Sequence, residues 1–125
     1  MRIRIIIAGS RSFSDYNKLS TVCNDALSWL QMAHKKDLKI EIVSGGANGA
    51  DQLGERYAKE KGHTLTVFKA DWNKYGKSAG YKRNAQMAKY ADILIAFWDG
   101  ESKGTKHMIN LAEDEELKIR IERYK

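Results

Sequence analysis

Apolar residues along the chain follow two patterns, short β-branched runs and longer stretches with three- and four-residue spacing. The first run, 4–8, is almost wholly apolar and ends at Gly9, which is typical of a strand buried on both faces of a sheet. Beyond it, apolar residues recur over 19–33 at helical spacing, and Ser14 or Asp15 would cap the helix that they predict. The period therefore changes from strand to helix early in the chain.

This alternation continues to the end of the chain. Further strands are predicted at 40–43, 65–68, 93–98 and 117–121, and further helices at about 48–61, 82–90 and 104–116. The stretch before the third helix, rich in Trp, Tyr, Gly and Lys, is predicted to be a loop. The whole pattern predicts one α/β domain over residues 1–125, a Rossmann-like doubly wound parallel sheet with strand order 3-2-1-4-5 and helices on both faces. A ligand is expected where the loops after the first and fourth strands part.

Composition narrows the class of partner. The 125 residues carry a net charge of +6 and a pI near 9.4, and the basic surplus lies between residues 69 and 90, which favours anionic partners. The lone Cys23 has no partner for an internal disulfide, so a cytoplasmic location is expected. The apolar run at 5–8 is too short to span a membrane, and no membrane association is expected. The three histidines lack metal-site spacing, so no metal is expected. No cofactor is expected either.

Three of the predicted strand-to-helix loops contain small residues. Backbone amides can approach an anion there without obstruction by a Cβ, and the helix dipole favours negative charge. The expected ligand- or phosphate-binding residues are Gly9, Ser10, Arg11, Ser12, Gly45, Gly46, Gly49, Arg83, Lys103, Gly104 and Thr105. The chain contains neither a Walker signature nor a Gly-x-Gly-x-x-Gly fingerprint, which disfavours ATPase chemistry and dinucleotide cofactors.

Four further residues are expected to contact a ribose or a base, namely Asp51, Trp72, Asn84 and Asp99. Asp51 begins a predicted helix, where its carboxylate either stabilises the N-terminus or accepts hydrogen bonds from ribose hydroxyls. Trp72 either stacks on a base or is buried. Asp99 and the nearby Glu101 could bind a sugar, act as acid or base, or stay solvated.

Taken together, these loops resemble the small YspA-type proteins (DUF2493) of the SLOG superfamily, which occur in bacteria and their phages. The similar segments are 7–13, 43–51, 70–72, 77–84 and 96–106, so the resemblance extends over nearly the whole chain. The same superfamily includes the Lonely Guy phosphoribohydrolases, whose Arg-Lys-x-x-Met stretch is similar to the segment from Arg83 to Met87. By this resemblance Arg83 matches a functional arginine, whereas Met108 stands where those enzymes have a glutamate.

The resemblance implies two functions of different classes. The first is a binding module that senses or sequesters a nucleotide or nucleotide-derived signalling ligand. The second is an N-glycosidase acting on nucleoside 5′-monophosphates, with Arg83, Asp51, Asp99 and Glu101 as candidate catalytic residues, since a carboxylate would have to replace the missing glutamate. Single-stranded nucleic-acid binding through the basic stretch ranks third. A homo-oligomer is also expected, because relatives commonly dimerise beside the site and the aromatic segment 72–81 offers contact area.

Overall fold

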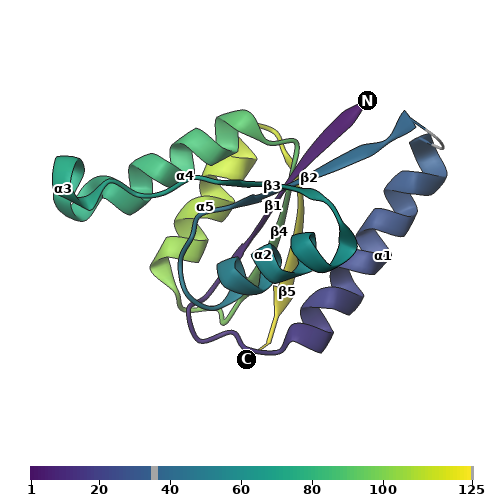
Figure 1. Ribbon diagram of the computed structural model, residues 1–125. Helices are drawn as coiled ribbons and strands as arrows, with labels where there is room; N and C mark the ends of the chain where they lie inside the picture. Colours follow the sequence, from purple (N-terminus) through teal and green to yellow (C-terminus); the bar gives the residue numbers. More distant parts are fainter. Residues whose placement is uncertain (35–36, 125) are drawn as a thin grey trace.

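A computed structural model describes residues 1–34 and 37–124 and shows a five-stranded, wholly parallel sheet (Figure 1). The strand order is β3-β2-β1-β4-β5, which confirms the Rossmann-like arrangement predicted from the sequence. The strands are β1 (Arg2–Gly9), β2 (Lys39–Ser44), β3 (Thr64–Val67), β4 (Ile93–Trp98) and β5 (Lys118–Arg123). The helices are α1 (Tyr16–His34), α2 (Ala50–Lys61), α3 (Trp72–Tyr75), α4 (Ala79–Tyr90) and α5 (Lys103–Asp114). No helix in the described ranges has the length and apolar character needed to cross a membrane.

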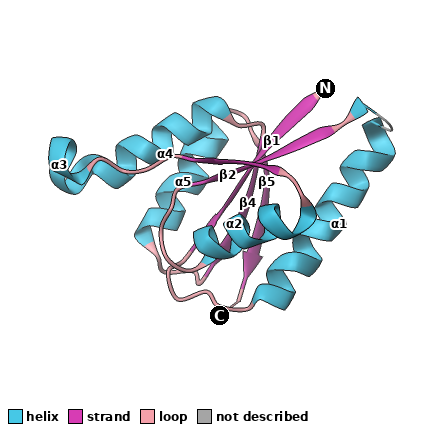
Figure 2. Ribbon diagram, in the orientation of Figure 1, coloured by secondary structure: helices cyan, strands magenta, loops and turns pink. Residues whose placement is uncertain are grey.

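The central strand β1 separates two apolar cores. Its odd-numbered isoleucines pack under α1 and α2, whereas Ile6 and Ala8 pack under α4 and α5 on the opposite face. Figure 2 shows the two pairs of helices on opposite sides of the sheet. Because both faces of β1 are buried, an uninterrupted apolar run was the correct sign of its position. Cys23 lies in the first core, where burial raises the pKa of its thiol to about 12.

The carboxyl ends of β1 and β4 approach each other very closely. The Ser10 amide donates to the Phe97 carbonyl at 3.0 Å, and the Asp99 amide donates to Ser10 Oγ at 3.3 Å. A Cβ on Gly9 would lie 2.2 Å from the Phe97 carbonyl oxygen and 2.9 Å from the Ala50 Cβ. Glycine is therefore required at this position by the packing of the backbone, and the two loops diverge immediately beyond it.

The segment between β3 and α4 differs from the prediction. The sequence predicts a loop followed by a helix from about Lys82, but the structure shows the short helix α3, a 3-10 turn (Gly76–Ser78) and then α4 from Ala79. Asp71 caps α3 by accepting the Lys74 amide at 3.1 Å. None of the residues in α3 or the 3-10 turn is buried, so this helical structure lacks the apolar periodicity by which helices are detected in a sequence.

The close approach at Gly9 predicts the effect of adding one methyl group. Gly9→Ala should lower the free energy of unfolding by at least about 2 kcal/mol, because the methyl group collides with backbone atoms. Gly104→Ala is the matched control, since its Cβ would meet nothing within 4 Å and alanine favours the helix by about 1 kcal/mol or less. Urea denaturation of both variants measures the difference, and equal midpoints would contradict the packing described here.

Candidate functional site

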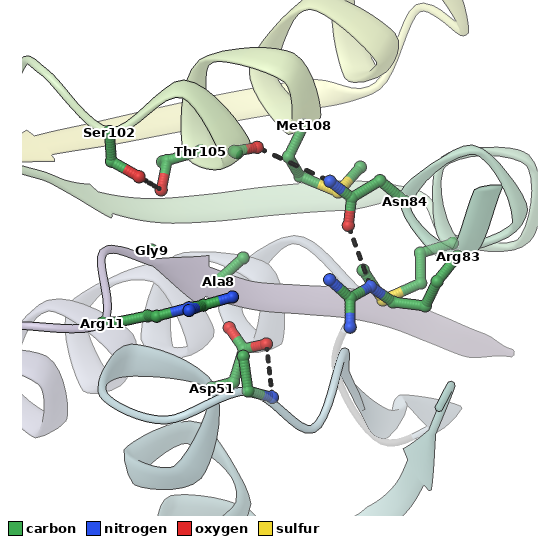
Figure 3. Close-up of a pocket in the computed structure, with 12 residues that line it drawn as sticks. Ala8, Gly9, Arg11, Asp51, Arg83, Asn84, Ser102, Thr105 and Met108 are labelled. Atoms are coloured by element: carbon green, nitrogen blue, oxygen red, sulfur yellow. Dashed lines mark hydrogen bonds between the residues drawn. The ribbon is translucent and has the colours of Figure 1, made fainter. Parts of the chain in front are cut away.

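A cavity of about 100 Å³, the inner cavity, opens beyond the ends of β1 and β4 (Figure 3). It lies where the strand order reverses, which is the expected ligand position in a doubly wound sheet. Its lining residues come from all the surrounding loops and helices: Ala8, Gly9, Arg11, Ala47, Asp51, Arg83, Asn84, Met87, Ser102, Gly104, Thr105 and Met108. The structure thus brings together seven of the residues that the sequence proposed for ligand, ribose or base contacts: Gly9, Arg11, Asp51, Arg83, Asn84, Gly104 and Thr105.

Asp51 and Arg83 are neighbours because the residue between them has no side chain. A Cβ on Gly45 would lie 2.9 Å from Asp51 Oδ2 and 3.1 Å from the Arg83 Cδ. Arg83 in turn donates from Nη1 to the Gly45 carbonyl at 2.6 Å, so α4 is tied to the loop after β2. Gly45 therefore positions a carboxylate and a guanidinium on one wall of the cavity.

Asp51 is almost fully buried, with 5% of its surface exposed. Burial raises the pKa of its carboxyl from 3.8 to about 6, although a hydrogen bond from the Ala47 amide at 3.2 Å and the charge of Arg83 act in the opposite direction. The dipole of α2, at whose first turn it lies, also favours the charged form. The sequence left two roles open for Asp51, and its position on the cavity wall is compatible with both.

Arg83 is held in place by neighbours on its own helix and across the cavity. Its Nε donates to Asn84 Oδ1 at 3.0 Å, and Asn84 Nδ2 reaches the Gly104 carbonyl at 3.5 Å. Burial lowers the pKa of the Arg83 guanidinium, Asp51 opposes that shift, and the charge of Arg11 adds to it. Arginine nevertheless remains charged in proteins, so the cavity retains its cation at neutral pH.

Arg11 gives the cavity a second positive charge. Figure 3 shows the side chains of Arg11, Asp51 and Arg83 directed into the same space. Two guanidinium groups and one carboxylate line the cavity, which leaves it with a net positive charge when Asp51 is ionised. The first turns of α2 and α5 also border it, and the leading amides of a helix lack partners within that helix. The arrangement is suited to an anion.

A larger cavity of about 400 Å³, the outer cavity, adjoins the inner cavity and shares Ala47 and Arg83 with it. Trp72, which is half exposed, and Lys69 form part of its wall beside the glycines of the loop after β2. Its other lining residues are Gly45, Gly46, Gln52, Glu55, Val67 and Ala70. Trp72 is not buried in the core, so its ring is available for stacking, as one of the two sequence interpretations required.

Other predicted residues lie outside the inner cavity. Ser10 is buried and Ser12 Oγ lies 3.0 Å from the Tyr124 hydroxyl, so both hydroxyls contact other parts of the protein. Asp99 Oδ1 accepts the amides of Glu101 and Ser102 at 2.9 and 2.8 Å and shapes the loop before α5.

Three more predicted residues, Glu101, Lys103 and Gly49, also lie outside the inner cavity. Glu101 and Lys103 line a separate surface hollow with Trp98 and Lys106. A Cβ on Gly49 would lie 2.5 Å from the carbonyl oxygens of Ser10 and Arg11. This glycine therefore allows the loop after β2 to pack against the loop after β1.

Two charged residues of the outer cavity, Glu55 and Lys69, were not predicted as site residues. Glu55 lies one helical turn beyond Asp51 on α2, so the i, i+4 spacing was the available signal. Lys69 lies two residues after the end of β3 and was counted only as part of the basic stretch. In both cases the contribution to the site depends on how α2 and the loop after β3 pack together.

Two methionines contribute apolar surface to the otherwise largely polar lining of the inner cavity. Met87 and Met108 are fully buried and line it, so Met108 belongs to the core of α4 and α5 as well as to the site. Asp51 is the one carboxylate in the lining. Within the described ranges, no three His, Cys, Asp or Glu residues are grouped as metal ligands would be.

Comparisons with known proteins give the following matches. The family described as "YspA, cpYpsA-related SLOG family" matches residues 3–75. The Gene 61 protein of Mycobacterium phage D29 is 34% identical over 116 residues, which cover 88% of both chains. The solved structure of a predicted subunit of tRNA methyltransferase from Methanocaldococcus jannaschii is 15% identical with a TM-score of 0.43, and the match covers 97% of this chain and 67% of that one.

The buried carboxyl of Asp51 predicts a pH-dependent stability. Its pKa is about 6 in the folded chain against 3.8 unperturbed, so the folded protein binds more protons between these values and loses stability as the pH rises through them. Asp51→Asn has no titrating group there. Relative to the unmodified protein, its free energy of unfolding should rise by about 1.4 kcal/mol per pH unit from pH 4 to 6 and then level off.

Urea denaturation at pH 4, 5, 6 and 7 measures this difference. Asp114→Asn, at the exposed end of α5, provides the control for the loss of one aspartate. If Asp51→Asn and Asp114→Asn show the same pH dependence, the pKa of Asp51 is not raised in the folded protein.

Proposed function

The chain belongs to the YspA, cpYpsA-related SLOG family. We propose that it binds a nucleotide or nucleotide-derived ligand at the inner cavity and acts as a sensor or sequestering protein. The observation that supports this most strongly is the convergence of Arg11 and Arg83 on one small cavity that contains a single carboxylate. A phosphate group would supply the negative charge that this pair lacks, through charge-assisted hydrogen bonds. The first turns of α2 and α5 add backbone amides.

The shape of the site supports a ligand with more than a phosphate. The inner cavity, about 100 Å³, is smaller than the roughly 300–1,000 Å³ of most small-molecule sites. Together with the adjoining cavity of about 400 Å³ it reaches that range. A phosphate near Arg11 with its sugar beside Asp51 and Asn84 would direct a base over Arg83 toward Trp72. A nucleoside 5′-monophosphate therefore matches both the charge and the size of the two cavities.

We propose binding without turnover, although one observation favours the N-glycosidase alternative. The pKa of Asp51, about 6, suits a general acid or base near neutral pH. Glycoside hydrolysis usually employs two carboxylates on either side of the scissile bond, however, and the lining of the inner cavity holds only the carboxylate of Asp51. Asp51 is better matched to the ribose hydroxyls, as an acceptor.

The first test removes one of the two guanidinium groups. Arg11→Ala should weaken binding of nucleoside 5′-monophosphates by about tenfold to a hundredfold, because a hydrogen bond to a charged group contributes roughly 1.5–3 kcal/mol. Isothermal titration calorimetry measures the change. Arg56→Ala, which removes an arginine from the outer surface of α2, is the control and should bind as the unmodified protein does. Unchanged affinity in Arg11→Ala, or equal affinity for nucleosides without a phosphate, would refute phosphate binding here.

The second test concerns turnover. Nucleoside 5′-monophosphates incubated with the protein should be recovered intact, because Met108 supplies neither a proton nor a negative charge, and loss of a catalytic acid or base lowers rates by about a hundredfold to ten-thousandfold. Chromatographic separation of base and nucleotide gives the readout. Release of base that disappears in Asp51→Asn would instead establish the N-glycosidase function.

A further inference from the structure

The outer cavity combines an exposed aromatic ring with polar groups of opposite charge. Trp72 lies at the start of α3, and a Cβ on Gly80 would lie 3.6 Å from both Trp72 Cη2 and Arg83 Nη2. The indole edge is thus close to the guanidinium that also lines the inner cavity. A base emerging from the inner cavity would pass Arg83 and reach the indole, and aromatic rings stack on bases of any sequence. Stacking alone therefore provides affinity without selecting a base.

Glu55 offers a hydrogen-bonding group in the same cavity. It lines the same cavity from α2, and the buried Ser44 hydroxyl donates to its Oε2 at 2.7 Å. This bond fixes the carboxylate, and Oε1 accepts no hydrogen bond from any residue in the described ranges. An ionised carboxylate can only accept hydrogen bonds. Its partner on a base must therefore present donors.

Lys69 lines the cavity with the opposite chemistry, since an ammonium group only donates. Guanine presents two adjacent donors, N1–H and N2–H₂, next to the acceptor O6, and this set of groups complements a carboxylate and a lysine that line one cavity. Adenine places the acceptor N1 between its donor and the sugar edge, so its unprotonated N1 would face the carboxylate unfavourably. Hypoxanthine has the N1–H donor but no 2-amino group. We propose, on the basis of the function proposed above, that the outer cavity reads a guanine base, with Glu55 on its donor edge, Lys69 on O6 and Trp72 on its face.

Calorimetry with GMP, IMP and AMP tests the proposal on the unmodified protein. GMP should bind about ten to a hundredfold more tightly than AMP, which corresponds to one bidentate contact, and IMP should fall between them. Glu55→Gln should reduce or invert the ratio of GMP to AMP affinity, because an amide can donate to adenine N1 while it accepts from the 6-amino group. Glu60→Gln makes the same charge change on the outer side of α2, beside Tyr16, and should leave the ratio unchanged.

Trp72→Ala separates stacking from base reading. It should weaken all three nucleotides by about five to a hundredfold and leave the binding of ribose 5-phosphate unchanged, and Trp72→Phe should restore most of the loss. Equal affinities for GMP and AMP, or an unchanged ratio in folded Glu55→Gln, would overturn guanine reading while phosphate binding stands. If ribose 5-phosphate and all three nucleotides fail to bind, the proposed function itself fails. Should Glu55→Gln not fold, the comparison of GMP, IMP and AMP on the unmodified protein still decides.

Discussion

The close approach of β1 to β4 at Gly9 is the constraint on which the site depends. Only a residue without a side chain fits between the end of β1 and the Phe97 carbonyl, so the carboxyl ends of these two parallel neighbours lie in direct contact. The chain then leaves β1 toward α1 and leaves β4 toward α5, on opposite faces. The loops part at that point, and the cavity lies between them because no element crosses it.

Burial determines the electrostatic character of this cavity. Asp51 and Arg83 lie on either side of Gly45, and burial makes ionisation less favourable for both, since it raises the pKa of the carboxyl and lowers that of the guanidinium. Their mutual attraction does not fully offset this penalty. With Arg11 as a second cation, the cavity holds like charges close together, and an anionic group placed between the arginines would relieve their repulsion. Pre-positioned charge of this kind favours phosphate over neutral ligands.

The order of the strands could be predicted from the sequence because the strands and the four longer helices each show a local period of apolar residues. Parallel α/β connections then allow few topologies. The helical segment 72–78 could not, because it buries no residue and so has no apolar face. Among the site residues, Arg11 follows from its place after β1, whereas a specific role for Arg83 came from the resemblance to a known family. Glu55 and Lys69 were missed because their position depends on how α2 and the loop after β3 pack, which no local pattern encodes. Glu101 and Lys103 were grouped with the site because they follow β4, but the loop before α5 turns them toward another hollow.

A crystal structure of the protein grown with a nucleoside 5′-monophosphate would show directly whether the phosphate lies between the two arginines. We expect electron density for the phosphate between Arg11 and Arg83 near the first turn of α5, with the ribose beside Asp51 and the base in the outer cavity. A nucleotide bound instead along the exposed lysines of the 69–90 segment, with only solvent between the two arginines, would contradict it.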